Sequence, residues 1–404
     1  MQIGEVASFQ NGYAFKSKDF VQDGEYKIIK IKELKDGKVR FFNDSASVNV
    51  DDEWIIEKYI VEKGDVLFAL TGDPVNKNNP LSWVGRVSVY EDDQLALLNQ
   101  RVCKLVPKEG LNAKYIYYYF RTFNNFYALA SIAKGSASQA NISTKDIEAM
   151  EIALPSLNIQ NKIVSVLDSI EEKINQNNKI NKNLEQQAQA IFKSWFVDFE
   201  PFNGEMPHDW IASRLGDIAS IKTNSFSPVK NPDAQLEHYS IPAYDEQKYP
   251  VFESAAGVKS NKYILSKNSV MISKLNPDTK RVWRPMCLSE LAVSSTEFII
   301  FETFNPAYRD FVFSIIDSVA FSDWMCAHTT GSTNSRQRTA PSATLEFQVA
   351  LPDEKVITDF CAIVTPMYDT IAANICENQK LAQLRDSILP KLMSGELDVS
   401  DIDL

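Results

Sequence analysis

Residues 157–196 read LNIQNKIVSVLDSIEEKINQNNKINKNLEQQAQAIFKSWF, and this stretch decides how the rest of the chain is organised. Its apolar residues recur at alternating steps of four and three, which is the heptad pattern of a helix that buries one seam along its length. Two positions in the middle of the seam, Asn177 and Asn181, are polar. The apolar seam positions are Ile163, Leu167, Ile170, Ile174, Leu184, Ala188, Ile191 and Trp195. Such a helix requires a partner to cover the seam.

The C-terminal part of the chain repeats the seam and supplies this partner. Asn374 and Asn378 fall on the same phase as Asn177 and Asn181, and Arg385 interrupts the second seam near its end, where we expect the side chain to reach water. The apolar positions are Phe360, Val364, Met367, Ile371, Leu381, Ile388 and Leu392. An amide in an apolar seam costs stability unless it meets another polar group, so we predict that the two Asn pairs face each other and fix the register.

Connectivity predicts that the two helices run antiparallel, because the segment between them is domain-sized and can then close over one end of the rod. We therefore predict an α+β protein with two mixed α/β domains, separated by two long antiparallel coiled-coil helices, and an internal pseudo-two-fold repeat. The expected boundaries are 1–155 for the first domain, 156–200 for the first helix, 201–352 for the second domain, and 353–404 for the second helix and C-terminal tail. Two ordinary core helices are less favoured, because both seams share a polar interruption.

The two globular segments also repeat each other, which indicates a domain duplication rather than a solenoid. Residues 3–8 (IGEVAS) match residues 215–220 (LGDIAS), and the strand-like stretch 152–155 (IALP) matches 349–352 (VALP). Residues 206–210 (MPHDW) precede the second copy, whereas the first copy begins at the start of the chain. Either the first domain lacks an opening strand or cap, or the true start lies upstream.

Composition limits the class of protein. A chain of 404 residues with 44% hydrophobic residues has the size and composition of two or three globular domains, and no apolar run approaches the length of a membrane span. The N-terminus lacks a basic and apolar leader. Five cysteines without CxxC spacing favour the reducing cytoplasm and disfavour a zinc site. A net charge of −11 disfavours a free-standing non-specific nucleic-acid binder, so DNA contacts must come from local patches or from basic partners.

The sequence contains no GxGxxG, GxxxxGK[ST] or HExxH motif, and its three histidines are far apart. The stretch 305–308 (NPAY) is similar to an amino-methyltransferase motif, but the equivalent stretch 112–115 (NAKY) indicates that both are helix caps. A nuclease motif built from Pro277-Asp278 and 353–355 (DEK) has little support, because the two parts lie far apart in sequence. We predict neither a catalytic nor a metal site.

A basic stretch in the second globular segment is the strongest indication of DNA binding. Basic loops hold phosphates, and Arg, Lys, Asn and Gln side chains read base edges. The candidate residues are Lys259, Lys262, Lys274, Lys280, Arg281 and Arg284, followed by Asn334, Arg336 and Arg338 in the loop after Gly331-Ser332. A solvated basic face in an acidic protein is the competing interpretation.

The first globular segment gives weaker candidates, which an ordinary solvated surface explains equally well. They are Lys16, Lys77 in the stretch 76–79 (NKNN), Arg86, and Ser136 with Gln139 in the counterpart of the charged loop.

This order of parts resembles the specificity subunit of type I restriction-modification enzymes. The resemblance covers nearly the whole chain and is most specific at the helix ends, where Leu154-Pro155 leads into the first helix, 190–196 (AIFKSWF) closes it and 389–397 (LPKLMSGEL) closes the second. It implies a non-catalytic, cytoplasmic DNA-binding subunit without cofactors of its own, whose two target-recognition domains read a bipartite, asymmetric site on double-stranded DNA. It also implies two modification subunits that use S-adenosylmethionine, and restriction subunits with ATP and Mg that can join them.

The helical rod would then act as a ruler between half-sites. A rod of about 60 Å spans less than two turns of duplex at about 34–36 Å per turn. The alternative from another class is a coiled-coil scaffold whose twin domains bind proteins and recognise no DNA. The sequence leaves the recognised bases open.

Overall fold

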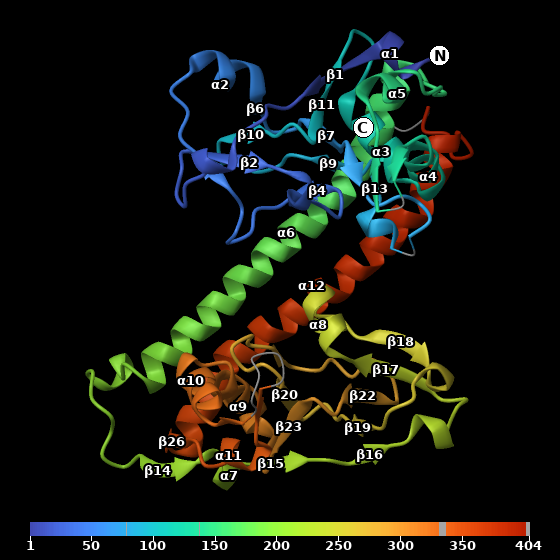
Figure 1. Ribbon diagram of the computed structural model, residues 1–404. Helices are drawn as coiled ribbons and strands as arrows, with labels where there is room; N and C mark the ends of the chain where they lie inside the picture. The colour runs from blue at the N-terminus through green and yellow to red at the C-terminus, as the bar shows by residue number, and fades with distance from the viewer. Residues whose placement is uncertain (78, 137, 331–336, 401–404) are drawn as a thin grey trace. The chain divides into compact units, whose positions relative to one another are not determined.

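The computed structural model describes residues 1–77, 79–136, 138–330 and 337–400, and Figure 1 labels its helices and strands. The chain forms two compact units: unit 1 consists of Met1–Glu172 with Ala382–Leu404, and unit 2 consists of Lys173–Leu381. Helix α6 (Leu157–Phe196) begins in unit 1 and ends in unit 2, and helix α12 (Glu354–Ser394) begins in unit 2 and ends in unit 1. The helices begin close to the expected boundaries, but each compact unit contains part of both.

Unit 1 contains a six-stranded sheet of order β1-β11-β7-β9-β4-β3, a four-stranded sheet of order β5-β2-β10-β6, and a small sheet of order β12-β13-β8. Its strands are β1 (Ala7–Asn11), β2 (Tyr26–Ile29), β3 (Leu34–Lys35), β4 (Lys38–Val39), β5 (Ser47–Val48), β6 (Ile60–Val61), β7 (Val66–Ala69), β8 (Thr71–Gly72), β9 (Val87–Val89), β10 (Ala96–Leu98), β11 (Val102–Pro107), β12 (Lys134–Ser136) and β13 (Gln139–Asn141). Its shorter helices are α1 (Ile3–Val6), α2 (Glu53–Tyr59), α3 (Ala113–Arg121), α4 (Phe123–Ser131) and α5 (Thr144–Glu148).

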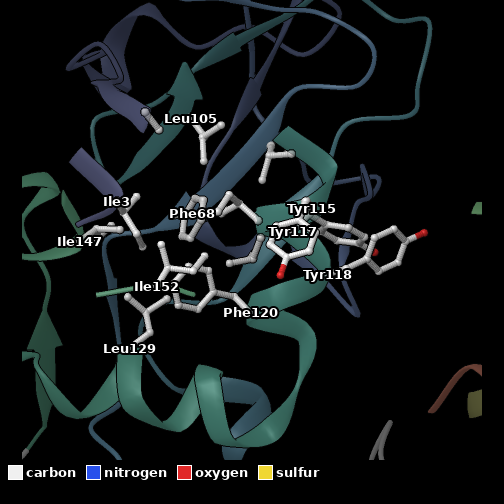
Figure 2. Packing of buried hydrophobic residues seen from close by; sticks show 14 of the residues in the cluster. Ile3, Phe68, Leu105, Tyr115, Tyr117, Tyr118, Phe120, Leu129, Ile147 and Ile152 are labelled. Atoms are coloured by element: carbon white, nitrogen blue, oxygen red, sulfur yellow. The ribbon is translucent and has the colours of Figure 1, made fainter. Parts of the chain in front are cut away.

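The core of unit 1 forms where helix α3 covers the larger sheet. All four residues of β7 are buried, as expected for a central strand covered on both faces. Phe68 of this strand meets Phe120 of α3 edge to face at 5.7 Å, and Figure 2 shows both rings among the aliphatic side chains of the cluster. Asn112 caps α3 by accepting a hydrogen bond from the Lys114 backbone N–H at 3.0 Å.

Unit 2 repeats this framework with sheets of order β15-β23-β20-β21 and β16-β19-β22-β17-β18. The parallel pair β2/β10 recurs as β17/β22, and the antiparallel pair β6/β10 recurs as β19/β22. The strands are β14 (Ile211–Arg214), β15 (Ala219–Lys222), β16 (Ser225–Phe226), β17 (Gln235–Tyr239), β18 (Val251–Ser254), β19 (Lys262–Ile264), β20 (Ser269–Ser273), β21 (Val282–Trp283), β22 (Ala292–Ser295), β23 (Phe298–Thr303), β24 (Thr329–Thr330), β25 (Arg338–Thr339) and β26 (Gln348–Leu351). The helices are α7 (Leu215–Ile218), α8 (Ile241–Gln247), α9 (Arg309–Ile316), α10 (Val319–Ala327) and α11 (Pro341–Thr344). The predicted α+β fold with duplicated domains is confirmed.

The two copies differ at their first strand. In unit 2, β14 pairs with β26 over four residues, from Ile211 opposite Leu351 to Arg214 opposite Gln348. In unit 1 the equivalent place holds a single bridge between Gln2 and Glu151.

The predicted asparagine pairs lie opposite each other, within unit 2. Asn177 Nδ2 donates to Asn378 Oδ1 at 2.9 Å, and Asn374 Nδ2 donates to Asn181 Oδ1 at 2.8 Å. Positions rise along α6 as they fall along α12, so the helices run antiparallel. This confirms both the predicted direction and the predicted pairing.

Apolar seam residues pack on both sides of the asparagines. In unit 1, Leu167 of α6 and Leu392 of α12 belong to one buried cluster, and in unit 2, Ala188 belongs to a cluster with Phe360 and Val364. Among the described residues, α12 is long and apolar enough to cross a membrane by length and composition alone. Its place in two protein cores accounts for that apolar character.

The expectation that Arg385 reaches water is wrong. Its side chain is only 16% exposed and its Nη1 lies 2.6 Å from Glu171 Oε1, within unit 1. Glu171 also lies 3.8 Å from the Lys38 ammonium. The seam pattern missed this pair because Glu171 is not a seam position of the heptad. The repeat places Ala188 and Tyr368 at the equivalent positions of unit 2, and there both are part of the apolar cluster.

The asparagine pair allows a direct test of what buried amides cost the helix seam in stability. Replacing both Asn181 and Asn374 by Leu is expected to raise the free energy of unfolding by roughly 1 kcal/mol or more, because apolar burial replaces a hydrogen-bonded pair. Both partners must change, since a single replacement leaves the other amide without its partner. Urea denaturation measures the gain. A double variant that is less stable than the parent would contradict this account of the seam.

Candidate nucleic-acid interface

In each unit, a loop that follows a central strand is joined to a β-hairpin far along the chain. In unit 1, β8 pairs with β13 of the hairpin, with Thr71 opposite Asn141. In unit 2, Leu275 forms a bridge with Arg338, and the Thr339 backbone N–H donates to Lys274 O at 3.1 Å. We call these elements the loop–hairpin site: residues 71–77, 79–83, 134–136 and 138–141 in unit 1, and residues 274–281, 329–330 and 337–339 in unit 2. The pairing brings two candidate stretches of the first domain, those of Lys77 and Ser136, into one structure, and the stretch of Ser136, which was expected to be a loop, forms a hairpin.

Local sequence explains the loop and hairpin of unit 1. Gly135 has φ +153°, and a Cβ there would lie 2.2 Å from Gln139 O, so the hairpin requires glycine. Asn79 caps a short 3-10 turn by accepting from the Leu81 N–H at 3.1 Å. The Trp83 indole N–H donates to Lys77 O at 2.8 Å, which closes the loop.

The candidates of the first domain fall into two groups. Lys16, Lys77, Ser136 and Gln139 are exposed and available to a ligand. Arg86 instead donates to main-chain carbonyl oxygens, Leu81 O at 3.0 Å and Ile31 O at 3.3 Å, and its burial lowers the pKa of its guanidinium. The geometry of Arg86 is that of a side chain which holds the main chain in place.

The lysines of the second domain divide in the same way. Lys259 is exposed, and Lys274 is half-buried with no acceptor for its ammonium among the described residues. Lys262 is 5% exposed and donates to Ser260 Oγ at 2.6 Å, and burial lowers the pKa of its ammonium. Lys280 lies 2.8 Å from Asp317. Of these four, only Lys259 and Lys274 have an ammonium group without a hydrogen-bond or ion-pair partner among the described residues.

Each candidate arginine of the second domain that the structure describes is paired with a carboxylate. Arg281 binds Asp245 with two contacts of 2.6 and 2.9 Å. Arg284 lies 11% exposed between Asp310 and Asp369, at 2.8 Å from each. Arg338 binds Glu297 with two contacts of 3.0 and 3.1 Å. The remaining candidates, Asn334 and Arg336, lie outside the described residues.

These ion pairs place negative charge beside the basic stretch of the second domain. The stretch contains a single acid in sequence, but its carboxylate partners come from helices and strands elsewhere in the fold. With 53 acidic against 42 basic residues in the chain, carboxylate partners are available to many basic side chains. Arg281 and Arg284 therefore have structural partners that a phosphate would have to displace.

The structure also presents a residue that the sequence did not indicate. Arg101 is exposed, and its Nη1 lies 3.3 Å from Thr71 Oγ1 and 3.3 Å from Asn141 Oδ1 of the loop–hairpin site. It was missed because it stands outside every basic run. Only its position in the repeat, where Glu297 occupies the same turn before a central strand, could have drawn attention to it.

The cap interpretation of the methyltransferase-like motif is confirmed. Asn305 accepts a hydrogen bond from the Ala307 N–H at 3.1 Å, just as Asn112 does from Lys114 at 3.0 Å. Among the described residues, no group of three or more His, Cys, Asp or Glu side chains could hold a metal ion.

Comparisons with known proteins agree with this architecture. A family model described as type I restriction modification DNA specificity domain matches residues 1–186. The MjaIX specificity subunit of Methanocaldococcus jannaschii is 25% identical, over 75% of this chain and 73% of its own length. The HindI specificity subunit of Haemophilus influenzae is 21% identical, over 68% of this chain and 75% of its own length.

A solved structure has the same fold. The crystal structure of a type I restriction-modification S subunit from M. genitalium aligns with a TM-score of 0.63 at 15% identity, over 97% of this chain and 95% of the other. The duplicated α+β units, the paired long helices and these sequence matches lead to one assignment: residues 1–186 belong to the type I restriction modification DNA specificity domain family, and most of the chain is similar to specificity subunits of type I restriction enzymes.

Proposed function

We propose that this chain recognises a bipartite DNA sequence for a type I restriction-modification complex, with one half-site read by each unit. The observation that carries the proposal is the loop–hairpin site, which stands on the same strand framework in both units but carries different side chains. Two sites with the same framework but different side chains are suited to recognising two half-sites of different sequence. Specificity subunits are the non-catalytic members of such complexes, so this chain serves recognition rather than bond cleavage.

The partners follow from this role. Double-stranded DNA is the ligand, and methyltransferase subunits, two per chain, act on the recognised site with S-adenosylmethionine. Restriction subunits, which use ATP and Mg, join the same complex in the cytoplasm. We further propose that the long helices set the number of unread base pairs between half-sites. The net charge of −11 fits a subunit whose partners supply much of the phosphate neutralisation.

Sequencing of methylated adenines tests the assignment as a whole. DNA from cells that express this chain with its modification partner is expected to carry methyl groups at one split, asymmetric sequence. If the complex formed and methylated DNA without such a sequence, the recognition role would be refuted and the scaffold alternative favoured.

The unpaired lysines allow a second, electrostatic test. Replacing Lys77 and Lys274 by Ala is expected to weaken DNA binding by the complex, and to reduce the slope of log K against log salt by about 0.9 for each lost phosphate contact. Lys355, which is 82% exposed on α12, provides the control. An unchanged salt slope in the Lys77→Ala/Lys274→Ala variant would show that these ammonium groups do not contact phosphates.

A further inference from the structure

We propose that Arg101 reads a guanine in the half-site of the first unit, an inference that rests on the proposed function. Arg101 lies in the turn between β10 and β11, beside the base of the β12–β13 hairpin. The proposal rests on three features of the site: the free edge of the guanidinium, the charge of its surroundings and its place in the repeat.

The guanidinium is held in one orientation with one donor edge free. Thr71 Oγ1 donates to Asn141 Oδ1 at 2.9 Å, and Arg101 Nη1 lies 3.3 Å from both oxygens. Both contacts use Nη1, and among the described residues Nη2 and Nε have no acceptor. Two parallel N–H groups are the donors that bind O6 and N7 of guanine in the major groove. The site therefore offers the edge that this contact requires, already positioned.

Among the described residues, no carboxylate lies within ion-pair distance of the Arg101 guanidinium. Its two anchors are a hydroxyl and an amide, which are both neutral. Arg281 and Arg338 of the second unit, by contrast, are each bound to a carboxylate by two contacts. Arg101 thus combines an anchored position with a charge that no carboxylate among the described residues neutralises within ion-pair distance.

The repeat indicates a base contact rather than a phosphate contact. The Leu70 N–H donates to Arg101 O at 2.9 Å, and the Lys274 N–H donates to Glu297 O at 2.9 Å, so Arg101 and Glu297 occupy equivalent positions. Asn141 and Arg338 are likewise equivalent, since they pair with Thr71 and Leu275. The arginine thus stands in the turn before the central strand in unit 1 (Arg101) and on the hairpin in unit 2 (Arg338), where the turn carries Glu297 instead.

Phosphates are the same in both half-sites, whereas bases differ. A phosphate contact at this position would favour a basic residue in the turn of both units, but Glu297 carries the opposite charge. A position that reverses charge on an otherwise shared framework is suited to reading sequence.

The experiment uses the complex of the full chain with its modification subunits and a DNA library randomised in both half-sites. Arg101→Ala is expected to lose the guanine preference at one position of one half-site, and to weaken binding to the parent site about tenfold or more. The second half-site, on the same molecules, is expected to stay unchanged. Loss of the arginine leaves the Thr71–Asn141 hydrogen bond in place, so the hairpin stays attached.

The double variant Arg101→Glu/Asn141→Arg reproduces the pair of the second unit and keeps the hairpin attached through an ion pair. It is also expected to lose the guanine preference. Arg40→Ala, an exposed arginine of unit 1 outside the loop–hairpin site, is the matched control and is expected to retain that preference.

Three results would overturn the proposal. Unchanged specificity in Arg101→Ala would show that Arg101 is not a reader. Weaker binding to all sequences, with the salt slope reduced by about 1, would identify a phosphate contact instead. Retention of the guanine preference in the double variant would assign that preference to another residue. If the parent complex itself shows no sequence preference, the proposed function fails, independently of Arg101.

Discussion

Replacing Asp310 by Asn is expected to lower the free energy of unfolding by about 3–5 kcal/mol. Asp310 of α9 is 2% exposed, and both carboxylate oxygens accept from the guanidinium groups of Arg284 and Arg309 at 2.8 to 3.2 Å. Thr365 donates to the same carboxylate at 2.7 Å. The Asn side chain keeps the shape but places an amide N–H against a guanidinium, and the two buried cations lose their counter-charge. Urea denaturation measures the loss.

Asp369 supplies the matched control, because it contacts the same Arg284 at 2.8 Å but is 62% exposed. Asp369→Asn is expected to cost less than about 1 kcal/mol, as for an exposed ion pair. Equal losses in the two variants would contradict the view that burial of Asp310 is decisive.

The same site predicts a pH dependence. Burial acts to raise the pKa of Asp310, but hydrogen bonds from Arg309 and Arg284 hold this pKa below its ordinary value. A carboxyl with a lower pKa in the folded state contributes stability above its unfolded pKa of about 3.9, and this contribution is lost as the pH falls. The stability difference between the parent and Asp310→Asn is therefore expected to shrink below about pH 4.

Replacing Arg385 by Ala is expected to cost about 3 kcal/mol, because it leaves Glu171 buried without its main partner. Burial acts to raise the pKa of Glu171, whereas Arg385 holds this pKa below its ordinary value. The pair therefore stabilises the fold above pH of about 4.3 and loses this contribution at lower pH. Thermal and urea unfolding of the full chain measure the effect.

Unit 2 indicates how to recover the loss. Its equivalents of Glu171 and Arg385 are Tyr368 and Ala188, both within an apolar cluster. The double variant Glu171→Tyr/Arg385→Ala is therefore expected to regain most of the stability lost in Arg385→Ala, since no unpaired charge stays buried. If the double variant were less stable than Arg385→Ala, the two ends of the helix pair would not be interchangeable.

Several features followed from the sequence because they depend on local periodicity or on self-comparison. The spacing of Leu167 and Ala188 fixed the buried face of the first long helix, since a helix places every third or fourth residue on one side. The coincidence of Asn177 and Asn181 with Asn374 and Asn378 specified the register of the antiparallel pair. Self-comparison also revealed the duplicated domains, because both halves retained the same buried framework.

The sequence indicated candidate residues of the site but not how they pair. Their positions in loops drew attention to Ser136 and Gln139 and to the basic stretch around Lys274. The sequence could not tell that Arg284 is enclosed by Asp310 and Asp369, because these carboxylates belong to other helices. Arg101 was not predicted from the sequence, because its neighbours Thr71 and Asn141 approach it only through strand pairing.

The sequence alone therefore determined the duplicated architecture and the paired helices, because hydrophobic periodicity and repeats are encoded along the chain. Tertiary structure alone decided which charges stay free. A charge is neutralised by whichever group lies within about 4 Å, and residues that meet at that distance, such as Arg385 and Glu171, are separated by most of the chain.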